Sequence, residues 1–217
     1  MDSDNEISFD LSDDEPLTAQ KILNTLREVW LNEKFSPELL KHKTEEVDCM
    51  MDQINQMEEN IGRLKKGDFR VVIHQMEVDR IRYLLSSYLR TRLEKIELYA
   101  VKLIEEDSKR EPLLQFLSPA ELKFAKECLS HMDSHLSLIA LRHMPPYVQN
   151  FDKEKMAIVP NMASHVFLRA KKNIHGIIVE GDSENRDEEV NLEENSQHIM
   201  RYESVAQYLK DGGVQLI

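Results

Sequence analysis

The sequence predicts a mainly α protein, in which a four-helix domain with a long third helix is followed by a small β-rich domain. Three observations support this fold class. No proline occurs between Pro37 and Pro112, and only two glycines interrupt that stretch. Four of the six glycines lie after residue 175, where turns are therefore expected. Apolar residues recur every three or four positions over the first two-thirds of the chain, which is the period of an amphipathic helix.

The first two helices are predicted from apolar spacing and from a start signal. The first covers residues 18–32, and the second begins with Ser36 as N-cap and Pro37 at the first helical position. The second helix ends near Lys66, before Gly67. The apolar face of the first helix consists of Ile22, Leu23, Leu26, Val29 and Trp30.

The third helix is predicted over residues 69–106 from a sustained apolar stripe. At about 1.5 Å per residue it is about 55 Å long, which exceeds the diameter of a domain of this size. We therefore expect part of its apolar surface to contact another chain. The stripe consists of Ile73, Met76, Ile81, Leu84, Leu85, Tyr88, Leu89, Leu93, Ile96, Tyr99 and Leu103.

The fourth helix is predicted to begin with a capping box, in which Ser118 and Glu121 satisfy each other's backbone, and to end at Met144. His143 falls on its apolar face, so we expect a hydrogen-bonded histidine in the core. The remaining apolar positions on that face are Leu122, Ala125, Leu129, Met132, Leu136 and Ile139.

The last third of the chain is predicted to form the β-rich domain, with an acidic loop over residues 180–194 and a short helix over residues 205–209. Short strands are expected over 166–168, 177–179, 198–202 and 214–217. The resulting division is an acidic disordered tail (1–17), a helical A domain (18–146), a linker (147–163) and a β-rich B domain (164–217).

Charge is concentrated in two segments of a chain whose formal net charge is −12. Residues 1–16 contain seven acids and no base, and residues 180–194 contain eight acids and one arginine. The rest of the chain is close to neutral, which excludes a strongly basic nucleic-acid-binding protein of the usual kind. Two cysteines, Cys49 and Cys128, are too few for a disulfide framework and fit a reducing compartment.

No targeting or membrane segment is expected. The acidic N-terminus lacks the basic start and apolar core of a signal peptide. The longest uncharged apolar run, residues 156–168, has 13 residues and contains Pro160, whereas a membrane span needs about 20 apolar residues. These features predict a soluble intracellular protein.

No motif predicts an enzyme. Gly62 and Gly67 have the glycine spacing of a phosphate-binding loop, but Asp68 stands where that loop needs lysine. His131 and His135 have a spacing that can bind a metal, although no further ligand motif accompanies them. A metal-dependent enzyme that uses these two histidines is therefore one alternative hypothesis.

A DNA-binding factor is the other alternative hypothesis, because the middle of the third helix carries a group of cations. Asp79, Glu94 and Glu97 alternate with them, so ion pairs within the helix and contacts to another subunit are favoured over phosphate binding. The cations of this group are Arg80, Arg82, Arg90, Arg92 and Lys95.

The N-terminal tail combines acids with three apolar residues, Ile7, Phe9 and Leu11. This composition is typical of a disordered segment that can fold onto a partner. Acidic residues follow Ser3 and Ser12, so phosphorylation by an acid-directed kinase is a further hypothesis.

Several sequence blocks resemble the Sld-five subunit (subunit four) of the GINS DNA replication complex over about residues 18–217. The most specific is HQMEVDRIRYLLSSYLRTRLEKIE at 74–97. The others are WLNEKFSPELL at 30–40, LSPAEL at 117–122, HMPP at 143–146, VFLR at 166–169, SQHIMRY at 196–202 and VQLI at 214–217.

The resemblance implies a non-catalytic structural subunit of a nuclear heterotetramer with Psf-one, Psf-two and Psf-three. That tetramer joins Cdc-forty-five and the MCM hexamer in the replicative helicase, and the MCM subunits hydrolyse ATP. It also implies that the tail segment around Ile7, Phe9 and Leu11 can bind a hub protein of the Ctf-four type. No cofactor, metal, membrane or direct DNA contact is expected.

No catalytic, cofactor-binding or metal-binding residue is predicted. The residues expected at partner interfaces are Trp30, Phe35, Arg82, Tyr83, Arg90, Val214, Gln215, Leu216 and Ile217.

Overall fold

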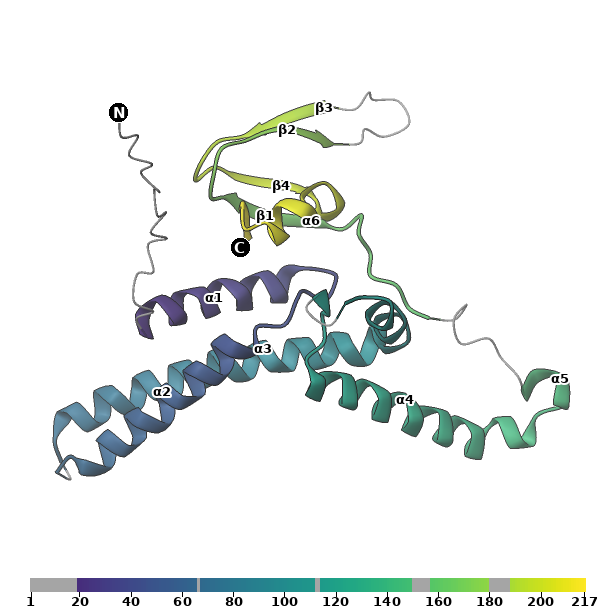
Figure 1. Ribbon diagram of the computed structural model, residues 1–217, viewed down its shortest axis with the longest axis horizontal. Helices are drawn as coiled ribbons and strands as arrows, with labels where there is room; N and C mark the ends of the chain where they lie inside the picture. Colours follow the sequence, from purple (N-terminus) through teal and green to yellow (C-terminus); the bar gives the residue numbers. More distant parts are fainter. Residues whose placement is uncertain (1–18, 66, 112–113, 150–156, 180–187) are drawn as a thin grey trace, which may run out of the picture.

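The computed structural model describes residues 19–65, 67–111, 114–149, 157–179 and 188–217. Within these ranges a helical part precedes a small β-rich part, so the predicted mainly α fold class is confirmed (Figure 1). Among the described residues, no helix is both long enough and apolar enough to span a membrane. The helical part consists of α1 (Ala19–Phe35), α2 (Thr44–Arg63), α3 (Phe69–Ser108), α4 (Pro119–Ile139), the short 3-10 helix η2 (Leu141–His143) and α5 (Pro146–Gln149).

The start of α2 differs from the prediction, because the segment from Ser36 to Lys43 is not helical. Ser36 is buried, and its hydroxyl donates to the carbonyl of Glu38 at 2.9 Å. The Lys95 ammonium donates both to the Ser36 hydroxyl, at 2.8 Å, and to the Glu38 carbonyl, at 2.9 Å. These tertiary hydrogen bonds override the local start signal, and α2 begins at Thr44.

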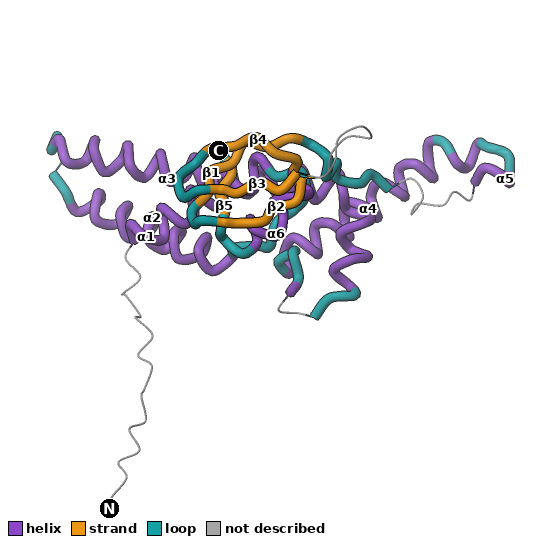
Figure 2. Tube along the Cα trace, turned by 90° about the horizontal axis from the view of Figure 1, so that it is seen from above, coloured by secondary structure: helices purple, strands orange, loops and turns teal. Residues whose placement is uncertain are grey.

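Helix α3 is the central element of the helical part. Asp68 caps it by accepting a hydrogen bond from the Arg70 backbone at 2.9 Å. The helix has 40 residues and a non-helical backbone conformation at Tyr99, which marks a kink. Helices α1 and α2 both pack against its first half, and α2 and α3 form a projecting hairpin (Figures 1 and 2). Their shared core includes Leu26, Met50, Ile54, Val78, Ile81 and Leu85.

Helix α4 has the predicted capping box, in which the Glu121 backbone donates to Ser118 Oγ and the Ser118 backbone donates to a Glu121 carboxylate oxygen. It packs against α3, but its second half extends away from the rest of the helical part (Figure 1). Ala125 is its only residue in the buried class. The prediction that His143 lies in the core is wrong, because the described residues directly after Ile139 extend away from the helical core and His143 is exposed.

The β-rich part contains a three-stranded antiparallel sheet in the order β4-β1-β5 and a separate hairpin of β2 and β3. Helix α6 packs with both, and one hydrophobic core joins them through Leu168, Ile177, Leu192, Tyr202 and Leu216. The elements are β1 (His165–Ala170), β2 (Ile174–Val179), β3 (Glu188–Leu192), β4 (Gln197–Arg201), α6 (Tyr202–Lys210) and β5 (Val214–Leu216).

Strand β3 corrects the prediction of a loop over residues 180–194. Val190 pairs with Ile177 and Leu192 with Ile174, and Leu192 is fully buried. The alternation of these two apolar residues with exposed Glu189 and Asn191 matches a strand that covers a core on one face. The acidic composition of the segment concealed that period.

The two parts of the chain contact each other through α1. The Leu216 backbone N–H on β5 donates to Asn32 Oδ1 at 2.8 Å, and Lys171, directly after β1, pairs with Glu28. Figure 1 shows the β-rich part lying along α1. Strand β5 therefore connects the β-rich core to the helical part of the same chain.

Candidate protein-interaction surfaces

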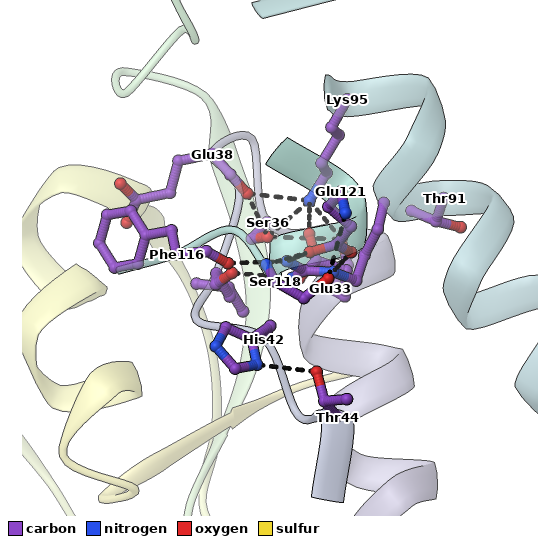
Figure 3. A network of polar contacts seen from close by, with 12 residues as sticks. Glu33, Ser36, Glu38, His42, Thr44, Thr91, Lys95, Phe116, Ser118 and Glu121 are labelled. Atoms are coloured by element: carbon purple, nitrogen blue, oxygen red, sulfur yellow. Dashed lines mark hydrogen bonds and ion pairs between the residues drawn. The ribbon is translucent and has the colours of Figure 1, made fainter. Parts of the chain in front are cut away.

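A buried ionic network centred on Arg92 joins the helical elements. Figure 3 shows Glu33, Lys95, Phe116 and Glu121 of this network gathered from α1, α3, the loop before α4 and α4. Arg92 is 1% exposed and makes a two-point ion pair with Glu121 on α4, with its Nε 2.7 Å from Oε1 and its Nη2 3.0 Å from Oε2. Its Nη1 donates to Glu33 on α1 at 3.0 Å and to the carbonyl of Leu40 at 2.8 Å. The carbonyl of Phe116 accepts a further bond at 2.9 Å.

Lys95, one helical turn beyond Arg92, extends this network. Its ammonium lies 2.8 Å from the second carboxylate oxygen of Glu33, which is itself 1% exposed. Together Arg92 and Lys95 bind α1, the segment after it and the loop before α4 to a single face of α3. We call Arg92, Lys95, Glu33 and Glu121 the Arg92 network.

The pKa values in the network follow from burial and pairing. Burial alone would raise the pKa of Glu121, but hydrogen bonds from Arg92 and Ser118 hold it below its usual value. Burial alone would lower the pKa of Arg92, yet its bonds to Glu121 raise it. Burial lowers the pKa of Lys95. Because every charge has a partner, the network serves to position the helices.

The first half of α3 carries an exposed apolar face. Phe69 and Met76 lie seven residues apart and therefore on the same side of the helix. Their side chains are 72% and 68% exposed. The other large apolar residues of this face are Val72, Ile73 and Tyr83, each at least half exposed. Helix α2 packs against the opposite side of α3, where Val78, Ile81 and Leu85 are buried.

Helix α4 carries a second exposed apolar face. Met132, Leu136 and Ile139 continue the line that starts at buried Ala125, but they are 51%, 39% and 60% exposed. A groove of about 220 Å³ runs between α3 and α4. It is lined by Leu98, Val101, Leu129, Met132, Leu136 and Ile158, among others. We call Met132, Leu136 and Ile139 the α4 stripe.

The predicted interface residues fall into two groups. Trp30 and Tyr83 meet edge to face with ring centroids 6.5 Å apart, and the Trp30 indole donates to Ser87 at 2.9 Å. Tyr83 and Phe35 are exposed, while Trp30 is half-buried. Arg90 is exposed nearby on α3, and Arg82 is exposed but pairs with Glu58 on α2. The structure brings Trp30 and Tyr83 together on one surface.

The predicted C-terminal residues lie in and beside β5. Val214 and Leu216 are buried in the core of the β-rich part, while Gln215 and Ile217 are half-buried. Ile217 donates its backbone N–H to the carbonyl of Phe167 at 3.1 Å. Their contacts are within this chain, and an interface role for them stays a prediction. Ile7, Phe9 and Leu11 lie outside the described residues.

The residues behind the two alternative hypotheses are the cations of α3 and the histidine pair of α4. The cations of α3 do not form a continuous basic surface, because Arg80 pairs with Glu77, Arg82 with Glu58, and Arg92 is buried. His131 and His135 are exposed on α4. In the described part of the chain, no cluster of three or more histidine, cysteine or acidic residues could hold a metal ion.

Sequence reasoning missed the Arg92 network. One signal was present, since Arg92 lies between Tyr88 and Ile96 at steps of four residues on the apolar stripe of α3. A charged residue at such a position needs a buried partner. Its partners, Glu33 and Glu121, are far away in sequence and gave no local signal.

Comparisons with known proteins agree with this architecture. A family model described as "GINS complex protein helical bundle domain" matches residues 30–140, and another, "DNA replication complex GINS protein SLD5 C-terminus", matches residues 160–217. The fold is thus a GINS-type helical bundle with a C-terminal β-rich region.

Relatives named "DNA replication complex GINS protein SLD5" match nearly the whole chain. The bovine (Bos taurus) protein is 48% identical over 203 residues, which cover 93% of this chain and 91% of the relative. The rat (Rattus norvegicus) protein is 46% identical over 210 residues, covering 95% and 93%. The Arabidopsis thaliana protein is 30% identical over 218 residues, covering 95% and 96%. The chain belongs to the SLD5 family of GINS proteins.

Proposed function

We propose that this chain is a structural, non-catalytic subunit of the GINS DNA replication complex and acts in the nucleus. Family membership supports a role in DNA replication and an assembly with the other GINS subunits. In this proposal the partners are Psf-one, Psf-two and Psf-three. The resulting heterotetramer joins Cdc-forty-five and the MCM hexamer to form the replicative helicase.

The observation that carries this proposal is the pair of exposed apolar faces on α3 and α4. A solvent-exposed α4 stripe would be unfavourable, because each large apolar side chain gains about 1.5–3 kcal/mol on full burial. A helix from another subunit, packed into the groove between α3 and α4, would cover Met132 and Leu136. A partner helix would therefore bury apolar side chains of α4 that the helical part leaves exposed.

The domain division is part of the same proposal. Residues 18–146 form the A domain, residues 147–163 the linker and residues 164–217 the B domain. The separate hydrophobic cores of the helical and β-rich parts support this division. The contacts of Asn32 and Glu28 with the β-rich part support a fixed placement of one domain on the other.

Substitution of the α4 stripe tests the proposal. Leu136→Asp with Ile139→Asp places two charges on the expected interface, and we expect the yield of the co-expressed tetramer to fall at least about tenfold. Ser134→Asp, on the opposite side of α4, is the matched control and should assemble normally. Size-exclusion chromatography of the co-expressed subunits measures both. Normal assembly of the double variant would contradict a role of α4 in the interface.

A further inference from the structure

The outer face of the sheet in the β-rich part carries an exposed apolar pair that is flanked by basic residues. Phe167 on β1 pairs with Ile199 on β4, and these side chains are 60% and 59% exposed. On one side of this pair His165 lies opposite Arg201, and on the other side Arg169 lies opposite Gln197. The face is therefore an apolar pair between two arginine-containing rungs, with no acid in these three rungs.

Strand β4 also presents an open backbone edge. Tyr202 donates to the Ser164 carbonyl and Ala170 to the Ser196 carbonyl, which fixes the alternation of bonded pairs between β1 and β4. By that alternation the backbone N–H and C=O groups of Ile199 and Arg201 point away from β1. In the sheet as described, β4 is an edge strand with β1 as its single neighbour.

A groove lies along this edge. It has a volume of about 440 Å³ and is lined by β4 residues, by His165 and by Val179 and Val190 of the hairpin. An extended segment in this groove can bond to the backbone of β4 and place every second side chain beside Ile199, the β4 member of the apolar pair. The rim of His165, His198 and Arg201 favours a segment that carries acids.

The sequence of this chain contains a segment with that chemistry. In residues 4–15, Ile7, Phe9 and Leu11 occupy every second position, and acids stand at Asp4, Glu6, Asp10, Asp13, Asp14 and Glu15. A period of two is the one that an added strand requires. Asp13 and Glu15 share the parity of Ile7, Phe9 and Leu11, so in an extended segment they lie on the side that faces the two arginines of the sheet face.

The segment is also tethered near the β-rich part. Helix α1 contacts the β-rich part at Glu28, which is about 14 Å along the helix from Ala19. The eight residues from Leu11 to Ala19 span up to about 27 Å when extended. Tethering of this kind gives a segment an effective concentration of about millimolar at its own chain, so even a weak contact is populated.

We propose that the N-terminal segment around Ile7–Leu11 binds along β4 of its own β-rich part, beside Ile199. This inference is independent of the helical interfaces described above. It gives the tail an intramolecular binding site, with which any external partner of the same residues has to compete.

Photo-crosslinking in the full-length chain, co-expressed with the other GINS subunits, tests this proposal. A benzophenone amino acid replaces Phe9, and mass spectrometry locates the crosslinked peptides after irradiation. We expect crosslinks to residues 165–169 and 197–201 of the same chain. Mixing isotopically heavy and light preparations distinguishes them from crosslinks to a second copy. Crosslinks mainly to a second copy, to another subunit or to the helical part would overturn the proposal.

Variants of the charged sheet residues and of the apolar tail residues test whether these side chains make the contact. Arg169→Glu with Arg201→Glu should lower the crosslink yield about tenfold. This is the size of effect expected when two favourable surface charge pairs become repulsive. Lys172→Glu with Lys126→Glu has the same change in net charge away from this face and should leave the yield unchanged. Ile7→Ser with Leu11→Ser should also lower the yield and leaves the described part of the chain intact. Equal yields in all three variants would overturn the proposal.

Discussion

At the scale of single residues, Arg92 determines how the helical part is held together. It is a buried cation with five hydrogen bonds, to two carboxylates and two backbone carbonyls. Removing an arginine from such a site leaves Glu33 buried without its full complement of partners. The free-energy cost of an uncompensated buried charge is larger than the value of the original pair.

Arg92→Ala should therefore lower the free energy of unfolding by about 3–5 kcal/mol. Arg90→Ala is the matched control, since Arg90 is exposed on the same helix and should change stability by less than about 0.5 kcal/mol. Chemical denaturation of the assembled complex, followed by the fluorescence of Trp30, measures both. A loss for Arg92→Ala no larger than for the control would show that the network does not stabilise the fold.

The low pKa of Glu121 predicts how stability depends on pH. The folded-state pKa lies below the ordinary value of 4.5, so the unfolded state binds the proton first as the pH falls. The contribution of Glu121 is fully present above that ordinary value and is lost as the pH falls through the folded-state pKa. Measurements of unfolding free energy between pH 6 and pH 3 should show this decline.

Glu121→Gln should make that decline shallower, because the titrating group is gone. Glu127→Gln, which changes an exposed carboxylate on the same helix, should keep the slope of the unmodified chain. Equal slopes for the unmodified chain and for Glu121→Gln would show that Glu121 does not contribute to the acid sensitivity.

At the scale of secondary-structure elements, the sequence predicted what depends on local periodicity and capping. The stripe of α3 and the Ser118–Glu121 capping box required no knowledge of other elements, and both are present. The start of α2 could not be predicted, because Lys95 holds the segment after Ser36 from a position almost 60 residues away. Strand β3 was concealed because its segment is rich in acids, and its outward positions hold the polar residues Glu189 and Asn191.

The predicted interface residues also divide into features that follow from local periodicity and features that depend on contacts with distant elements. Exposure of Tyr83 was accessible from helix periodicity, whereas the hydrogen bond between Trp30 and Ser87 depends on how α1 crosses α3. The pairing of Phe167 with Ile199 depends on the register of β1 and β4, which short strands do not reveal in sequence.

Strand β5 carries a prediction at this scale. Deleting residues 214–217 removes Val214 and Leu216 from the core and breaks the Leu216–Asn32 hydrogen bond to α1. We expect the β-rich part to lose its fixed position and the tetramer yield to fall. Limited proteolysis of the linker region and size-exclusion chromatography measure the two effects. Truncation of Ile217 alone is the control, because it spares both buried side chains.

Unchanged linker proteolysis after the larger deletion would contradict the role of β5 in joining the two parts. If proteolysis increases but the tetramer yield is unchanged, β5 organises this chain without acting at a partner interface.

At the scale of the whole molecule, the helical part leaves two apolar faces uncovered. The Arg92 network holds α1, α3 and α4 together, yet the first half of α3 and the second half of α4 expose apolar faces on opposite arms of the helical part (Figure 1). Faces of this kind mark interaction surfaces in soluble proteins. In the function proposed above, assembly with the other GINS subunits covers both faces.

The most direct test of this account is light scattering on the purified chain, alone and after co-expression with Psf-one, Psf-two and Psf-three. We predict aggregation or poor yield of the chain alone and a single 1:1:1:1 particle after co-expression. A stable, monodisperse monomer that remains unassociated in the presence of the three partners would contradict the account.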